Sequence, residues 1–148
     1  MKIYLDVCCL NRPFDDQTQH RIRLESEAVI AILDHCRSKN WQLVGSEVID
    51  FEISQTPDDD RRERVSILVA LAQFKVIVDQ KIVNRATELQ NLGLKPFDAL
   101  HIACAEKGEV DVLLTTDDEL LQKITQKNII ITVRMANPLK WLTEVISE

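Results

Sequence analysis

Hydrophobic and polar positions along this chain form two alternating patterns. Short continuous apolar runs are typical of strands buried on both faces, and the segments between them repeat apolar residues every three or four positions, as amphipathic helices do. The predicted strands are residues 3–8, 42–46, 75–78, 112–115 and 129–133. The predicted helices are residues 20–39, 48–53, 61–73, 81–92, 97–107 and 117–127, and a last helix begins at Pro138. Strands that alternate with helices predict an α/β fold, a three-layer α/β/α sandwich with a mainly parallel central sheet.

Size and composition are those of one ordinary domain. The chain has 148 residues, of which 45% are hydrophobic and 28% are charged, and we expect residues 1–148 to form a single domain. Its apolar runs are shorter than the roughly 20 residues that cross a bilayer. The segment from Met1 to Asp6 holds a carboxylate where a secretory signal peptide needs an apolar stretch. We therefore expect no membrane association and a cytoplasmic location.

Charge and cysteine content exclude some classes of function. A net charge of −6 argues against a general nucleic-acid coat protein, because such proteins are usually basic, but it is compatible with a nuclease whose metal site is acidic. The four cysteines and three histidines match no zinc-binding spacing. We expect the cysteines to be reduced and mostly buried.

Four acidic residues stand at positions where an α/β sheet places its ligands. Asp6 lies near the end of the first strand, and Asp117 follows the strand at 112–115. Asp98 lies in the first turn of a markedly apolar helix, and Glu52 lies on the short helix after the second strand. Ligands of such sheets bind beyond the carboxyl ends of the strands. The four acids are therefore predicted to meet at one edge of the sheet.

Each acid taken alone also has a structural explanation. Asp98 can interact favourably with its helix dipole, and Asp117 can cap the helix that follows it. Glu52 can face solvent, whereas a buried strand-end carboxylate such as Asp6 is costly without a partner. Four carboxylates held close together repel one another unless they are protonated or share a cation. Oxygen ligands select hard ions, so the predicted cofactor is Mg²⁺ or Mn²⁺.

Four sequence blocks resemble the PIN-domain nucleases, and among these the VapC-type toxin ribonucleases. The blocks are IYLDVCCLN at 3–11, SEVIDFEI at 46–53, KPFDALHIACA at 95–105 and LLTTDDEL at 113–120. The resemblance implies a PIN-like fold with Asp6, Glu52, Asp98 and Asp117 as catalytic metal ligands. Glu47 and Asp50 remain alternatives to Glu52 because they lie on the same segment. Thr115 or Thr116 is a candidate to hydrogen-bond a carboxylate or a metal-bound water.

The chain departs from this family's pattern after the first strand. Cys8 stands where the family usually has Ser, Thr or Asn, and a thiol is a poorer partner for a hard-metal site. Asn11 is a candidate to supply the missing polar contact, and Arg12 is a candidate to contact the scissile phosphate. His101 lies one turn after Asp98 and either orients that carboxylate or is a hydrogen-bonded core histidine.

The resemblance implies hydrolysis of RNA phosphodiester bonds by the toxin of a toxin–antitoxin pair. It also implies a small antitoxin protein as partner and a homodimer. The main alternative is a PIN-like binding module that pairs with a partner protein and cleaves RNA weakly or not at all, which the departure at Cys8 favours. A third class, an aspartyl phosphoacceptor on a similar sheet, requires either a DxD after the first strand or a lysine near the acceptor, and the segment Asp6-Val7-Cys8 provides neither.

Overall fold

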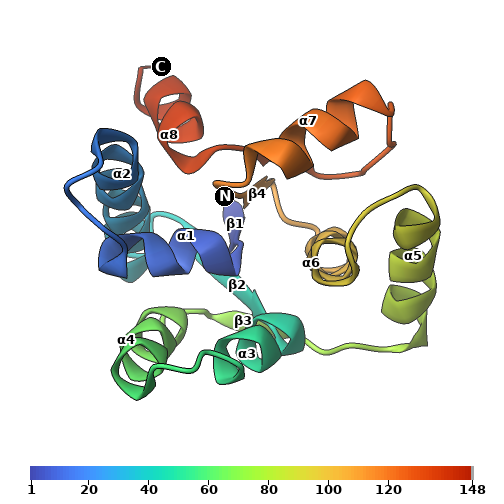
Figure 1. The fold of residues 1–148 in the computed structure, drawn as a ribbon, viewed down its shortest axis with the longest axis horizontal. Helices are drawn as coiled ribbons and strands as arrows, with labels where there is room; N and C mark the ends of the chain where they lie inside the picture. Colours follow the sequence, from blue (N-terminus) through green and yellow to red (C-terminus); the bar gives the residue numbers. More distant parts are fainter. Residues whose placement is uncertain (148) are drawn as a thin grey trace.

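The computed structural model describes residues 1–147 and contains a central sheet in which every pairing is parallel (Figure 1). The strands follow the spatial order β3-β2-β1-β4-β5. They are β1 Lys2–Leu5, β2 Gln42–Ser46, β3 Phe74–Val76, β4 Val112–Leu114 and β5 Arg134–Ala136. The first strand of the chain therefore lies at the centre of the sheet, with strands on both sides.

Helices cover both faces of this sheet. They are α1 Val7–Asn11, the 3-10 helix η1 Arg12–Phe14, α2 His20–Arg37, α3 Glu47–Ser54, α4 Asp59–Val69, α5 Gln80–Asn91, α6 Pro96–Lys107, α7 Asp118–Gln126 and α8 Pro138–Ile146. Figure 1 shows α1, α2 and α8 on one side of the sheet and α5 and α6 on the other. The predicted three-layer α/β/α architecture is confirmed. Between residues 1 and 147, no helix combines the length and hydrophobicity that a bilayer crossing requires.

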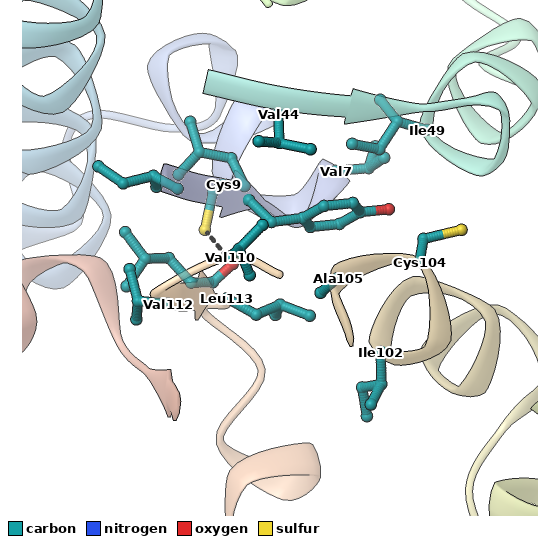
Figure 2. Packing of buried hydrophobic residues seen from close by; sticks show 14 of the residues in the cluster. Val7, Cys9, Val44, Ile49, Ile102, Cys104, Ala105, Val110, Val112 and Leu113 are labelled. Atoms are coloured by element: carbon teal, nitrogen blue, oxygen red, sulfur yellow. Dashed lines mark hydrogen bonds between the residues drawn. The ribbon is translucent and has the colours of Figure 1, made fainter. Parts of the chain in front are cut away.

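The core follows from the central position of β1. Ile3 lies opposite Leu43 of β2 and also opposite Val112 of β4, and all three side chains are buried. Figure 2 shows the sheet residue Leu113 near Ala105 of α6, and both belong to one cluster of buried hydrophobic residues. Burial on both faces explains why the strands are apolar throughout instead of alternating between apolar and polar residues.

The first strand is shorter than the apolar run at residues 3–8 predicted. It ends at Leu5, and α1 begins at Val7. The reason lies in Asp6, which has an extended backbone and caps α1 by accepting a hydrogen bond from the Val7 N–H at 2.8 Å. A side-chain cap of this kind starts a helix even within an apolar run.

The strand predicted at residues 129–133 is wrong, because the last strand is Arg134–Ala136. The apolar run before it is hydrogen-bonded to side chains of two helices and not to β4. Arg85 of α5 donates to the carbonyl of Ile130, and Glu106 of α6 accepts from both the N–H and the hydroxyl of Thr132. Ile130 itself is 85% exposed, so hydrophobic pattern alone misplaced this element.

Candidate active site

Two neighbouring strands place polar side chains at the carboxyl edge of the sheet. Asp6 follows β1, and the Thr115–Asp117 segment follows β4, the strand paired with β1. Asp6 is 7% exposed, and its carboxyl is held at both oxygens. Its Oδ1 accepts from the Val7 N–H at 2.8 Å, and its Oδ2 accepts from the Thr115 hydroxyl at 2.9 Å. A carboxylate has about four lone-pair positions, so each oxygen can still accept from a further partner or bind a cation.

Thr115 connects the two strand ends. Its hydroxyl oxygen donates to Asp6 and accepts from the backbone N–H of Asp117 at 3.1 Å. Asp117 also caps α7, since its Oδ1 accepts from the Leu120 N–H at 3.2 Å. The capping role anticipated for Asp117 is therefore present, and it fixes one oxygen of a residue whose backbone N–H is linked to Asp6 through the Thr115 hydroxyl.

Glu52 reaches the same place from α3. Its Oε1 lies 2.7 Å from Nε2 of His101 on α6, and ligand atoms of Asp6, Glu52 and His101 all lie within 4.8 Å of one another. The two alternative acids of this helix are engaged elsewhere. Glu47 accepts from the Val78 N–H at 2.8 Å, and Asp50 pairs with Lys75 at 2.6 Å.

Asp98 is the fourth acid, half-buried in the first turn of α6, which Pro96 begins. Burial and, to a smaller extent, the negative charges of Asp6 and Asp117 together raise the pKa of its carboxyl to about 6. Like charges shift a pKa in this way only when they are near one another. Asp98 therefore lies within electrostatic range of both strand-end acids.

The residues at this edge fit a hard divalent cation. Their donor atoms are mainly carboxylate oxygens, the ligands that Mg²⁺ and Mn²⁺ prefer. Asp6 and Glu52 are close enough to share an ion, and repulsion from Asp6 and Asp117 adds to the larger effect of burial in raising the pKa of Asp98. A bound cation would remove this repulsion.

The polar side chains after Asp6 are occupied by other parts of the protein. Asn11 donates to the carbonyl of Val7 at 3.0 Å and accepts from Arg61 at 3.2 Å. The Sγ of Cys8 lies 3.4 Å from the Thr115 hydroxyl and 3.4 Å from the Thr116 N–H. The thiol thus packs against the turn after β4. Thr116 contacts the thiol with its backbone N–H and not with its side chain.

Arg12 belongs to a buried ionic network next to the site. Its guanidinium pairs with Asp15 at 3.0 Å and with Glu25 at 2.9 Å. Glu25 is 1% exposed and also accepts from Arg21 and from Asn137. These contacts join η1, α2 and the segment before α8, so the structure assigns Arg12 a scaffold contact.

His101 bonds a different carboxylate from the one its spacing indicated. The three-residue separation placed it beside Asp98, but its Nε2 bonds Glu52 and its Nδ1 lies 2.6 Å from the Tyr4 hydroxyl. Burial lowers the pKa of His101, but the hydrogen bond to Glu52 and the charges of the nearby acids outweigh it, and the pKa is raised above 6.5. Sequence gave no sign of Tyr4, because an aromatic residue in a buried strand is an ordinary core residue.

Comparison with known proteins places this arrangement in a family. The family model described as PIN domain matches residues 3–126, which is most of the chain and includes all four acids. The chain belongs to the PIN domain family. The resemblance of the four sequence blocks to PIN domains is thereby confirmed, and a search of curated proteins finds no match to the sequence.

Chains in two solved structures have the same fold at low sequence identity. A chain in the crystal structure of VapBC2 from Rickettsia felis, bound to a DNA fragment from its promoter, is 15% identical, with a TM-score of 0.59. A chain in the structure of VapBC-1 from nontypeable Haemophilus influenzae is 14% identical, with a TM-score of 0.57. Each comparison covers 93% of this PIN chain and 98% of the other chain.

Proposed function

We propose that this PIN protein is a Mg²⁺- or Mn²⁺-dependent endoribonuclease and the toxin of a toxin–antitoxin pair. The observation that supports it most directly is the proximity of Asp6 and Glu52 at the sheet edge, together with the effect of the Asp6 and Asp117 charges on Asp98. Membership in the PIN family and the similarity in fold to chains of VapBC complexes point in the same direction. Asp6, Glu52, Asp98 and Asp117 are the proposed metal ligands.

The chemistry proposed is hydrolysis of an RNA phosphodiester bond by water. A bound divalent cation supplies positive charge that acidifies the attacking water and stabilises the leaving oxyanion. The protein holds its ligands ready for that cation: Asp6 is fixed by Val7 and Thr115, and Glu52 is fixed by His101. Prearranged ligands need little reorganisation when the ion and the phosphate arrive.

The first test measures cleavage of labelled RNA by purified protein in Mn²⁺ or Mg²⁺ and in EDTA. Asp98→Asn and Glu52→Gln are expected to reduce cleavage by at least about 100-fold, because each removes a ligand charge. Asp50→Asn is the matched control, since Asp50 lies on the same helix as Glu52 but pairs with Lys75, and it is expected to cleave normally. RNA loss that persists in EDTA and in Asp98→Asn would show a contaminating nuclease and remove the proposal.

The toxin role needs a test in cells. It implies a cytoplasmic protein, a small antitoxin encoded beside it, and a homodimer of the PIN chain. Induced expression of the wild-type chain alone is expected to stop growth, and co-expression of the neighbouring gene is expected to restore it. Asp98→Asn is the control for the burden of expression. Normal growth with abundant, folded wild-type protein would contradict the toxin role.

The inactive binding module is distinguished by the same measurements. In that case the protein forms a stable complex with the antitoxin but leaves RNA intact in Mn²⁺. Cys8 lies on α1, and its thiol packs against the turn after β4 beside Thr115, so Cys8→Ser is the informative variant. If the thiol weakens the site, Cys8→Ser is expected to cleave RNA faster than wild type.

A further inference from the structure

A chain of buried polar groups runs from the centre of the sheet to Glu52. His101 is 2% exposed, Tyr4 and Ser46 are both 0% exposed, and all three lie among core residues. The Ser46 Oγ lies 2.7 Å from the Tyr4 hydroxyl, which lies 2.6 Å from Nδ1 of His101. On the other side of the ring, Nε2 lies 2.7 Å from Glu52 Oε1. At its inner end, Ser46 caps α3 by accepting from the Ile49 N–H at 3.0 Å.

The direction of the last hydrogen bond follows from the chemistry of its partners. An ionised carboxylate only accepts hydrogen bonds, so Nε2 of His101 must carry the proton that it shares with Glu52. A protonated Nε2 has no lone pair to offer a metal ion. In the neutral ring, Nδ1 then accepts from the Tyr4 hydroxyl, which fixes the tautomer and the orientation of the imidazole.

Glu52 needs such a contact more than Asp6 and Asp117 do. It has the longest side chain of the four, it lies on a helix of only eight residues, and its side chain is 29% exposed. Asp6 and Asp117 are each held by backbone N–H groups close in sequence. Ordering a long carboxylate side chain costs conformational entropy at the moment of binding unless a partner has ordered it beforehand.

We propose that His101, held by Tyr4, is a positioning residue that orients Glu52 for the divalent cation. This inference rests on the proposed metal site. Nε2 also lies 3.8 Å from Asp6 Oδ1, so the ring sits between two of the proposed ligands and fixes their spacing. An apolar residue would pack at this position as Ala99 and Ile102 do on the same helix, and buried polar chains are costly unless every member is paired.

The test measures Mn²⁺ binding to the free protein by electron paramagnetic resonance, with no RNA present. The variants are His101→Leu, which removes the donor, His101→Gln, which can keep an N–H near the position of Nε2, and Tyr4→Phe, which frees the ring. We expect His101→Leu to weaken Mn²⁺ affinity by about 10–100-fold, with His101→Gln and Tyr4→Phe in between. Saturating Mn²⁺ is expected to restore most of the cleavage rate of His101→Gln.

Several outcomes would overturn the inference. One is wild-type Mn²⁺ affinity in folded His101→Leu, or in both His101→Gln and Tyr4→Phe if the leucine variant does not fold. Another is a directly coordinated nitrogen in the pulsed spectrum of wild type, which would make His101 a ligand. Absence of Mn²⁺ binding in wild type would remove the metal site as well. Mn²⁺ binding that weakens as expected in a protein that leaves RNA intact would sustain the role of His101 and remove the proposed nuclease.

Discussion

Asp98→Asn is expected to make the metal-free protein more stable although it destroys the site. Burial and the charges of Asp6 and Asp117 raise the Asp98 pKa from 3.8 to about 6. At about 1.36 kcal/mol per pKa unit, this difference corresponds to a penalty of about 3 kcal/mol for the charged form. The carboxyl is only half-buried, so solvent screening reduces the expected gain to about 1–2 kcal/mol.

The pH dependence of this gain has a definite sign. The folded protein binds the Asp98 proton more tightly than the unfolded chain does, so wild type is fully stabilised below pH 3.8 and loses that stability as pH rises through about 6. The difference between Asp98→Asn and wild type is therefore near zero around pH 4 and complete above about pH 7. Urea unfolding in EDTA at several pH values measures it.

A matched control measures how much of the stability change comes from losing the interaction of a carboxylate with the helix dipole. Glu119 is an exposed acid in the first turn of α7, as Asp98 is in the first turn of α6. Glu119→Gln removes a charge with the same dipole interaction and is expected to change stability by less than about 0.5 kcal/mol. Excess Mg²⁺ is expected to reverse the order of wild type and Asp98→Asn, because only wild type gains binding energy. Equal stabilities in EDTA at pH 7.5 would refute the view that burial and the neighbouring charges of Asp6 and Asp117 disfavour an ionised Asp98.

Three further substitutions test the scaffold by urea unfolding. Thr115→Val removes the donor to Asp6 and is expected to lower the free energy of unfolding by about 1–3 kcal/mol. Thr115→Ser keeps the hydroxyl and is expected to be close to wild type in stability. Equal losses in the two variants would show that the methyl group matters and not the hydroxyl. Glu25→Gln removes the buried charge that pairs with Arg12 and is expected to cost about 2–4 kcal/mol, and a loss below 1 kcal/mol would contradict its role. Gly93→Ala is expected to cost about 1–2 kcal/mol with RNA cleavage unchanged, because the φ of Gly93 is 107°.

The fold was predictable wherever hydrophobic pattern and chain punctuation agreed. Pro96 and Gly108 bracket α6, and the apolar run at 112–115 contains β4. The strand prediction failed at residues 129–133, where side chains of two helices, and not a neighbouring strand, bind the backbone. The apolar run before β5 is held by Arg85 and Glu106, and no local pattern announces such long-range bonds. The α1 helix was missed because only the cap that Asp6 provides distinguishes it from a longer strand.

The sequence was enough to propose which acids form the site, but not which hydrogen bonds the neighbouring side chains make. Strand ends and a helix start indicated Asp6, Asp98 and Asp117, and Glu52 was indicated by the short helix after the second strand, because the topology of parallel sheets directs such positions to one edge. The contacts of His101 depend on how α3 packs against α6. The three-residue spacing between Asp98 and His101 carries no information about that packing. The contacts of Asn11 likewise depend on Arg61, fifty residues away.

The central position of β1 has a consequence for the order of events during synthesis. The strand that leaves the ribosome first must pair with β4, and the Asp6–Thr115 contact joins residues 109 positions apart. Such distant pairings form late, because closing the long intervening stretch of chain costs conformational entropy. A nascent chain that lacks the Thr115–Asp117 segment carries only part of the acidic cluster, so the proposed site is completed only after β4 and the segment behind it have been made.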